Sequence, residues 1–267
     1  MTDIFPDGIH IAGRLGVTAR FINGELILAL EPRPEVTHHG MVRISVLSFL
    51  VDAGAGIVID DALDEWALTS DMSVRMRPRP APKRVDAAAT ILRRGRRSTT
   101  STVELTTDEG EPIAVGAIGF VKIPRRESDP PKPRVSPEAA ASIFSGVGAL
   151  ARPLREEAGI EVIDASMGEL RMEVTPVLRN PAGTLQGAMV ALLAEAATED
   201  FVSTRFDTPA IVTDLDLRYL AQAQVGPLRT RCRALGTGPD APVQVELIDT
   251  SVDRITTLVY ARATVIS

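Results

Sequence analysis

The sequence predicts an α+β protein with two tandem repeats, each an antiparallel sheet wrapped round one long central helix. Three observations lead to this prediction. Similar segments recur in both halves at nearly constant spacing, each half holds one long apolar run, and the neighbouring segments alternate apolar and polar residues. A chain of 267 residues is also long enough for two domains of about 130 residues each.

Matching segments occur in the same order in the two halves. Leu68–Met76 aligns with Ile211–Tyr219, and Val103–Leu105 aligns with Val245–Leu247. The segment at 211–219 alternates apolar and charged residues, which is typical of a half-buried antiparallel strand. We therefore expect the order strand, long helix and four strands in each repeat.

Two carboxylates hold the same position in this repeated pattern. Asp52 precedes Asp71 by 19 residues, and Glu195 precedes Asp214 by 19 residues. A single carboxylate on a helix is usually a solvated surface residue. The shared register is what makes Asp52 and Glu195 candidate functional residues.

Three helices are expected. The long apolar runs at about 42–63 and 185–205 are rich in Ala and Leu, which favour helix. Ser136 and Pro137 have the residue types preferred at a helix start, so a further helix should lead the second repeat and end before Pro153.

A proline-rich segment marks the boundary between the repeats. It contains four prolines among charged residues, a composition typical of a linker. The expected division is residues 1–123 for the first repeat, 124–135 for the linker, and 136–267 for the second repeat with its leading helix.

Composition argues against several classes of protein. A net charge of −6 and 4% aromatic residues are unlike a nucleic-acid-binding protein. With Cys232 as the one cysteine and three histidines, we expect neither an internal disulfide nor a metal site. Met1–His10 lacks the features of a secretory signal, and the apolar stretch Ile44–Ile59 is too short for a bilayer. We expect a cytoplasmic protein without membrane or nucleic-acid partners.

The most informative segment is Asn180–Glu195. Its Asn180, Gly187 and Glu195 match a signature of the hotdog-fold acyl-CoA thioesterase superfamily: Asn, then His-Gly, then an acidic residue eight positions after the glycine. The segment resembles the phenylacetyl-CoA thioesterase-like (PaaI-like) group, although Gln186 stands where that family usually has His. The resemblance implies a double-hotdog enzyme that hydrolyses acyl-CoA to a free acid and coenzyme A. It implies a carboxylate as base or nucleophile, and no cofactor besides the coenzyme A of the substrate.

The geometry of a helix restricts how these residues can cooperate. Gly187 falls at a helix start, where free amides and the helix dipole favour a developing negative charge. Gly187 and Glu195 lie eight residues apart on one helix, hence roughly 12 Å apart along its axis. They cannot act on one carbonyl group, so the carboxylate must come from an opposing antiparallel helix.

Our preferred site therefore combines both repeats. The second repeat supplies Asn180, Gln186 and the Gly187 amide, and the first supplies Asp52. Glu195 then faces the corner of the first repeat, where Arg43 and Ile44 stand in place of His and Gly. An alternative assigns that His-Gly pair to His39-Gly40, displaced by an insertion of four residues.

Four arginines form a basic cluster: Arg93, Arg94, Arg96 and Arg97. Guanidinium groups bind phosphates well, so the cluster is a candidate anchor for the phosphates of coenzyme A. An ordinary solvated arginine surface is the alternative.

Other functions remain open at this point. A non-catalytic acyl-CoA-binding module would keep the cavity without turnover. Gln186 and Ile44 favour that alternative, because they stand where the family pattern has His and Gly. A hotdog enoyl-CoA hydratase is a further alternative, but its Asp- and His-containing motif is absent. By analogy with the family we expect a homodimer. Acyl chain length and the choice between coenzyme A and acyl carrier protein stay undetermined.

Overall fold

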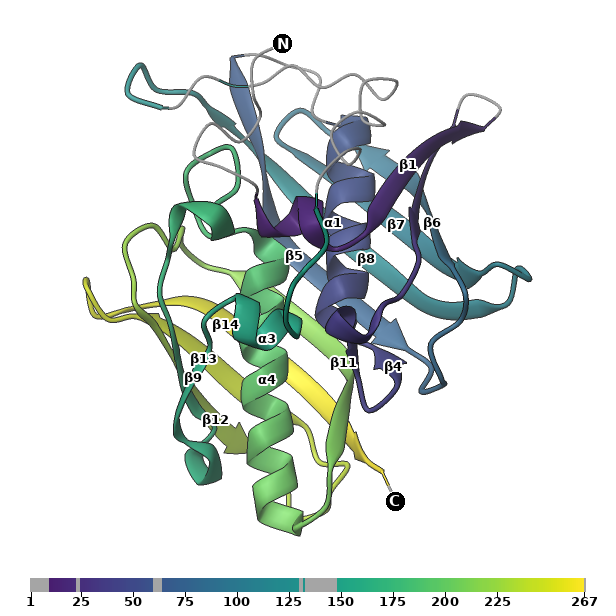
Figure 1. The fold of residues 1–267 in the computed structure, drawn as a ribbon. Helices are drawn as coiled ribbons and strands as arrows, with labels where there is room; N and C mark the ends of the chain where they lie inside the picture. Colours follow the sequence, from purple (N-terminus) through teal and green to yellow (C-terminus); the bar gives the residue numbers. More distant parts are fainter. Residues whose placement is uncertain (1–9, 23–24, 60–63, 130–131, 133–147, 267) are drawn as a thin grey trace.

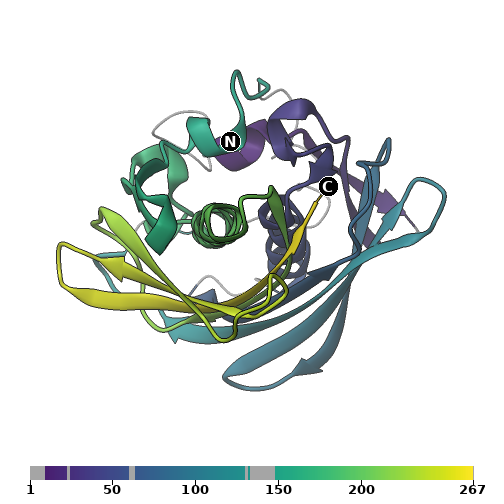
Figure 2. The same ribbon diagram turned by 90° about the horizontal axis from the view of Figure 1, so that it is seen from below.

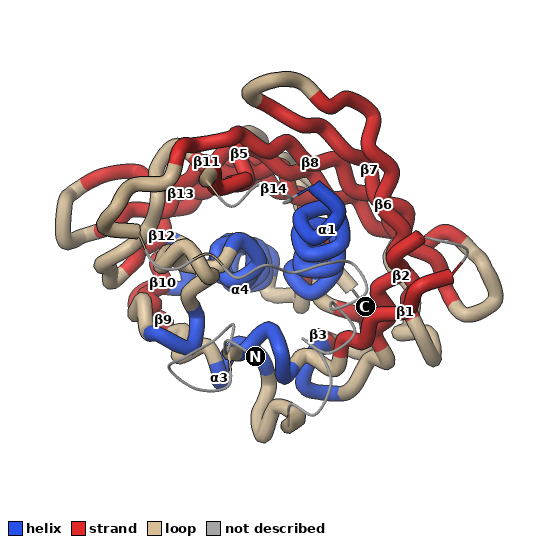
Figure 3. Tube along the Cα trace, turned by 90° about the horizontal axis from the view of Figure 1, so that it is seen from above, coloured by secondary structure: helices blue, strands red, loops and turns tan. Residues whose placement is uncertain are grey.

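One continuous sheet of twelve antiparallel strands curves around two long helices, which lie side by side on its concave face (Figures 1 and 2). The computed structural model describes residues 10–22, 25–59, 64–129, 132 and 148–266. Figure 3 shows the sheet enclosing α1 and α4 from one side, with β9, α3 and the adjoining loops across the other. The expectation of an α+β fold with antiparallel strands is confirmed.

The strands have the following bounds. In the first half they are β1 (Val17–Ile22), β2 (Glu25–Leu30), β5 (Glu65–Met76), β6 (Val85–Arg94), β7 (Ser98–Thr107) and β8 (Pro112–Pro124), with a small separate pair β3 (Thr37–His38) and β4 (Met41–Val42). In the second half they are β9 (Glu161–Asp164), β10 (Glu169–Met172), β11 (Ala210–Tyr219), β12 (Leu228–Ala234), β13 (Val243–Asp249) and β14 (Arg254–Val265).

The order of strands in the sheet has internal symmetry. It runs β1-β2-β6-β7-β8-β5 and then β11-β14-β13-β12-β10-β9, so the second half repeats the first in reverse. β5 and β11 pair at the centre, with Ser73 opposite Asp216, Asp71 opposite Arg218 and Arg75 opposite Asp214. These are the segments aligned by sequence, and Ser73 and Asp216 are aligned positions. The two halves of the sheet are therefore related by an approximate two-fold axis that passes through the β5–β11 pair.

The helices α1 (Ile44–Ile59) and α4 (Gly187–Phe206) provide much of the core. Their apolar side chains pack between the sheet and the loops, so they are buried over most of their surface. α1 packs closely on β8 where Gly116 faces Val51, since a Cβ added at Gly116 would lie 2.5 Å from Val51 Cγ2. A glycine at this strand position allows the helix to approach the sheet.

The helix boundaries differ slightly from expectation. Both long helices begin two residues later than expected. Val42 belongs to β4, and Gln186 is the N-cap of α4. The four-residue helix α3 (Leu154–Glu157) follows Pro153. The helix expected to begin at Ser136 falls on residues 136–147, which lie outside the described residues. Three of the four linker prolines also lie outside them. No helix in the described part of the chain has the length and apolar character needed to cross a membrane.

Candidate active site

A cavity of about 440 Å³ lies where the two halves meet. Its walls come from α1, β5 and β8 of the first half, and from α4, the end of β11 and the loops that precede α4 and follow β11. Its lining includes the polar residues Asp52, Asn180 and Tyr219, and Gly187 at the start of α4. The cavity has the size of a small-molecule site, so these residues are placed to meet a ligand.

Asp52, in the third turn of α1, is the carboxylate of this cavity. Thr69 Oγ1 on β5 donates a hydrogen bond to Asp52 Oδ1 at 2.7 Å. Gln186 Nε2 donates to Asp52 Oδ2 at 3.2 Å from the other half of the chain. Both carboxylate oxygens are thus oriented by donors, and Asp52 still lines the cavity.

Gln186 also forms the N-cap of α4. Its Oε1 accepts a hydrogen bond from the Ala188 amide at 2.7 Å, while its Nε2 donates to Asp52. One side chain therefore satisfies an unpaired amide at the helix start and fixes the carboxylate. This explains why an amide side chain suits a position where the family signature usually has His.

Gly187 is the first residue of α4 and approaches Asp52 closely. A Cβ added at Gly187 would lie 3.2 Å from Asp52 Oδ2 and 3.2 Å from Tyr219 Oη. Its amide is at the position where a helix has no intrahelical acceptor, so it can donate to a ligand oxygen. Tyr219 Oη donates to the Gly187 carbonyl at 3.1 Å, which fixes this turn of the backbone.

Asn180 holds the loop before α4. Its Oδ1 accepts hydrogen bonds from the amides of Ala182 at 3.0 Å and Thr184 at 3.1 Å. Asn180 also lines the cavity, and its Nδ2 has no hydrogen-bond partner among the residues that the structure describes. Nδ2 is therefore the group of Asn180 that can donate to a ligand.

Burial dominates the electrostatics of this site. Burial raises the pKa of Asp52 above its ordinary value, and the hydrogen bond from Thr69 partly offsets the shift. Burial, with the nearby Asp52 carboxylate, also raises the pKa of Tyr219 well above its ordinary value. Tyr219 thus acts as a neutral donor, and Asp52 is the group that can exchange a proton.

The two-fold related corner lies at the start of α1. The Ile44 amide donates to Glu195 Oε1 at 3.1 Å, the Ser45 hydroxyl donates to Glu195 Oε2, and Arg43 Nη1 lies 3.5 Å from Oε1. Each carboxylate therefore meets the N-terminus of the opposite helix, which confirms the expected antiparallel arrangement of the helices. Unlike Asp52, Glu195 is only 1% exposed.

Charged residues fill this second corner. Arg43 Nη1 binds Glu199 Oε2 at 3.1 Å, and His38 Nε2 lies 3.5 Å from the same oxygen. Burial and the neighbouring Glu195 raise the pKa of Glu199 to about 8 although Arg43 lowers it, and burial with Arg43 lowers the pKa of His38 to about 3. Burial lowers the pKa of Arg43, but the two carboxylates raise it above its ordinary value. The Arg43 side chain is 4% exposed and blocks the Glu195 carboxylate from ligands.

The alternative that placed the His-Gly pair at His39-Gly40 is wrong. His39 and Gly40 have positive φ angles of 47° and 74° and form the tight turn between β3 and β4. α1 begins four residues later, at Ile44. The turn therefore precedes the helix start and cannot supply its first amide.

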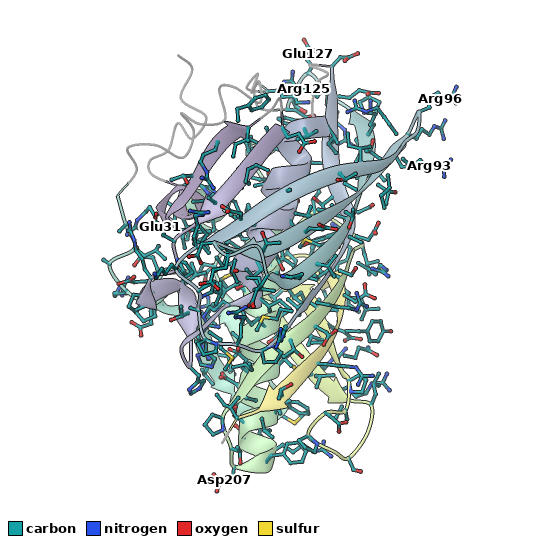
Figure 4. The ribbon with its side chains drawn as sticks, turned by 90° about the vertical axis from the view of Figure 1, so that its right-hand side faces the viewer. Glu31, Arg93, Arg96, Arg125, Glu127 and Asp207 are labelled. Atoms are coloured by element: carbon teal, nitrogen blue, oxygen red, sulfur yellow. The ribbon has the colours of Figure 1, made fainter. Side chains whose placement is uncertain are left out.

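The arginine cluster lies apart from these residues. Arg93, Arg94, Arg96 and Arg97 are exposed at the β6–β7 hairpin, and none of them lines the cavity. Figure 4 shows Arg93 and Arg96 projecting from the outer end of the hairpin, away from Arg125. The Lys122 amide donates to the Arg97 carbonyl at 2.9 Å, so the hairpin adjoins the end of β8 that does reach the cavity.

Sequence patterns did not identify two residues of the site. Thr69 and Tyr219 lie on the strands that follow the helices, where alternation predicts only which side chains are buried. Their roles depend on the distance to Asp52 and Gly187, which no local pattern encodes. Within the described residues no group of three or more His, Cys, Asp or Glu side chains is arranged to hold a metal ion.

Comparison with known proteins identifies the fold. No protein-family model matches the chain, and no curated protein has a matching sequence. Among solved structures, a hot dog fold protein of unknown function from Alicyclobacillus acidocaldarius is 13% identical with a TM-score of 0.65, covering 97% of this chain and 99% of its own. The tesB protein of Mycobacterium avium subsp. paratuberculosis is 14% identical with a TM-score of 0.64, covering 96% and 98%.

An acyl-ACP thioesterase from Bacteroides thetaiotaomicron is also similar. It is 13% identical with a TM-score of 0.60, and the match covers 89% of this chain and 97% of that one. These similarities, together with the antiparallel sheet around its helices, show that the chain has the hotdog fold.

Proposed function

We propose that this protein is a thioesterase that hydrolyses an acyl thioester, with acyl-CoA as its substrate and Asp52 as its base. The observation that supports this most directly is the position of Asp52 beside Gly187. A carboxylate oriented by Thr69 and Gln186 lies beside the first residue of α4 in a cavity of about 440 Å³. The names of structural neighbours, such as the acyl-ACP thioesterase from Bacteroides thetaiotaomicron, support the same reaction class.

Each group has a defined part in the proposed reaction. The thioester carbonyl accepts hydrogen bonds from the Gly187 amide and from Asn180 Nδ2, which stabilise the negative charge that forms on its oxygen. Asp52 takes a proton from water as the water oxygen bonds to the carbonyl carbon. When the carbon–sulfur bond breaks, the thiolate receives that proton from Asp52. The products are a free acid and coenzyme A.

An alternative to water activation uses Asp52 as a nucleophile. Its Oδ2 would attack the carbonyl carbon, displace the thiol and leave an anhydride that water then hydrolyses. Hydrolysis in ¹⁸O-labelled water separates the two routes. In a single turnover with excess enzyme, direct attack by water puts the label only in the product acid. If an anhydride forms, water can attack either of its two carbonyl carbons, so the label is divided between the product acid and Asp52.

We further propose that catalysis occurs at one of the two related corners. Glu195 matches Asp52 in sequence position, but its oxygens are engaged by Ile44, Ser45 and Arg43. A buried carboxylate whose oxygens are occupied by these donors has no room for a substrate carbonyl. Glu195 would thus contribute to stability, and Asp52 to turnover.

The remaining assignments belong to the same proposal. We assign the two halves to tandem hotdog units divided at residues 124–135, in a PaaI-like arrangement that works as a homodimer in the cytoplasm. We also assign the exposed arginines of the β6–β7 hairpin to the phosphates of coenzyme A. Replacing Arg96 and Arg97 by Ala should then raise KM for acyl-CoA, while KM for acyl-pantetheine, which lacks the nucleotide, stays unchanged.

The proposed activity is tested by steady-state hydrolysis. Purified protein is assayed with butanoyl-, octanoyl-, dodecanoyl-, hexadecanoyl- and phenylacetyl-CoA by following thiol release. We expect Asp52→Asn to lower kcat/KM by about 10³-fold. The control, Asp253→Asn, changes an exposed aspartate in the β13–β14 turn and should keep wild-type activity.

The same assay separates the non-catalytic alternative. Tight binding of acyl-CoA by calorimetry, with no thiol release from any substrate or from acyl carrier protein thioesters, would establish a binding module. Full activity in a folded Asp52→Asn variant would reject the assignment of the base.

A further inference from the structure

Tyr219 lies in the wall of the cavity, at the end of β11, and its hydroxyl has an unused acceptor. The Oη atom donates its one proton to the Gly187 carbonyl at 3.1 Å, because a carbonyl oxygen can only accept a hydrogen bond. Within the residues that the structure describes, this hydroxyl makes no other hydrogen bond. The lone pairs of Oη are therefore left to accept a hydrogen bond from a molecule in the cavity.

Asp52 and Tyr219 face one small space beside Gly187. The position of a Cβ added at Gly187 is 3.2 Å from Asp52 Oδ2 and 3.2 Å from Tyr219 Oη, so the two oxygens are at most twice that distance apart. Two acceptors that each lie about 2.8 Å from one water molecule are roughly 4 to 5.5 Å apart, which is within this limit. Glycine leaves this space open, and any other side chain would enter it.

A water molecule between these oxygens would be held by both of its hydrogens. Asp52 Oδ2 accepts one hydrogen bond from Gln186 and keeps a further lone pair for the water. With one hydrogen directed to Oδ2 and the other to Tyr219 Oη, the water oxygen has a lone pair free for a carbonyl carbon. Burial, with the nearby Asp52 carboxylate, raises the pKa of Tyr219, so the phenol stays neutral and does not repel that carboxylate.

The first half of the chain has no tyrosine at the equivalent position. Met76 aligns with Tyr219 in the repeated strands. A thioether is a weak hydrogen-bond acceptor, so it cannot replace the phenol oxygen. The corner at Glu195, which Arg43 blocks, therefore also lacks the phenol at the aligned position. The phenol occurs at the corner where the carboxylate lines an open cavity.

We propose that Tyr219 is a further catalytic residue, whose hydroxyl oxygen holds the attacking water together with Asp52. This inference rests on the proposed thioesterase function. As the water oxygen bonds to the carbonyl carbon, one of its protons passes to Asp52 and the other stays on the oxygen, hydrogen-bonded to Oη. When the carbon–sulfur bond breaks, Asp52 returns its proton to the thiolate. Tyr219 orients the water and neither gains nor loses a proton.

The first test replaces the hydroxyl alone. Tyr219→Phe keeps the ring in the wall of the cavity, so KM for acyl-CoA should stay within about three-fold of wild type. The kcat should fall by about 10- to 100-fold, because the water loses one of the two acceptors that orient it. Tyr260→Phe is the matched control, since Tyr260 is the other tyrosine of the chain and lies exposed on β14 outside the cavity.

A second nucleophile separates this role from support of the Gly187 backbone. The nitrogen of hydroxylamine attacks a thioester before it loses a proton, so its attack depends less on an oriented acceptor. With hydroxylamine present, the enzyme-dependent ratio of hydroxamate to acid should rise by about 10-fold in Tyr219→Phe. If Tyr219 only holds the Gly187 carbonyl, both products fall equally. An unchanged ratio would therefore overturn the inference.

A crystal structure of the wild-type protein tests the water site without turnover. We expect one ordered water within about 3 Å of both Asp52 Oδ2 and Tyr219 Oη. A water bound to Asp52 alone overturns the inference, and this structure decides the matter if Tyr219→Phe does not fold. An active wild type with unchanged kcat in Tyr219→Phe rejects the role of Tyr219 only. No thiol release by the wild type from any thioester rejects the proposed function, and this inference with it.

Discussion

Gln186 at the start of α4 donates a hydrogen bond to Asp52 in the middle of α1, across the boundary between the two halves of the chain. The two residues are 134 positions apart in the sequence. The contact joins the helix start that can stabilise a developing negative charge to the carboxylate that can take up a proton. It requires the helices to run antiparallel with their N-terminal halves in contact.

Replacing Gln186 by Ala tests this contact. The variant loses the N-cap of α4 at a cost of about 1 kcal/mol, and it loses a donor that orients Asp52. We expect kcat to fall by about 10- to 100-fold, with a smaller change in KM, because the carboxylate is no longer held in position. Steady-state kinetics with a thermal-unfolding control measures both effects. Wild-type kcat in the capping variant Gln186→Ser, which keeps an N-cap but loses the donor to Asp52, would show that only the cap matters.

Gly187→Ala tests the space at the helix start. The added Cβ would lie 3.2 Å from Asp52 Oδ2 and from Tyr219 Oη, so those side chains would have to move. Since alanine favours a helix over glycine, the free energy of unfolding should stay within about 1 kcal/mol of wild type. Activity should nevertheless fall by about 10-fold or more. A more stable variant with undiminished kcat would contradict the role of this approach.

The pH dependence of the rate should follow the ionisation of Asp52. Burial raises its pKa, so the reactive carboxylate form should accumulate only above the ordinary range for aspartate. We expect kcat/KM to rise with pH through that shifted pKa when measured from about pH 4 to about pH 9. Thr69→Val removes the hydrogen bond that lowers this pKa, so the inflection should move to higher pH. An inflection that does not move in this variant would exclude Asp52 as the titrating group.

Glu195→Gln separates stability from catalysis. The variant leaves Arg43, which is 5% exposed, with one buried carboxylate partner fewer, and breaking such a pair costs about 3 kcal/mol. The kcat of the folded protein should stay within about three-fold of wild type because the Asp52 corner is unaffected. Chemical denaturation and kinetics well below the unfolding transition provide the two measurements. If the loss of kcat matched that of Asp52→Asn, both corners would be catalytic.

Glu199 makes stability depend on pH. Its pKa rises from 4.5 in the unfolded chain to about 8 in the folded protein, so between these values the folded state binds a proton that the unfolded state has released. This contribution to stability is complete below the lower value and is lost as the pH rises through about 8. The nearby charged groups are Glu195, Arg43 and His38.

Glu199→Gln isolates that contribution. The glutamine cannot lose a proton, so the free energy of unfolding of the variant relative to wild type should increase as the pH rises toward about 8. Urea denaturation of both proteins at several pH values gives this difference. A difference that is constant over the range would show that Glu199 is ionised throughout.

The sequence by itself determined the repeat and its elements. A shared spacing of 19 residues placed Asp52 and Glu195 at equivalent helix positions, and alternation placed β5 and β11 as equivalent strands. Hydrophobic periodicity is local, because a helix or strand buries one face whatever it packs against. The same reasoning required a carboxylate from the opposite helix, since Gly187 and Glu195 are too far apart on α4.

Only the tertiary structure decided how the two corners differ. Asp52 meets Thr69, Gln186 and an open cavity, whereas Glu195 meets Ser45 and the Arg43 guanidinium. The place of Tyr219 against Gly187 was likewise absent from any local pattern. These properties depend on distances between residues far apart in the chain and on which side chain fills a given space. Burial and packing arise only when the elements come together, so they set the pKa values and the shape of the site.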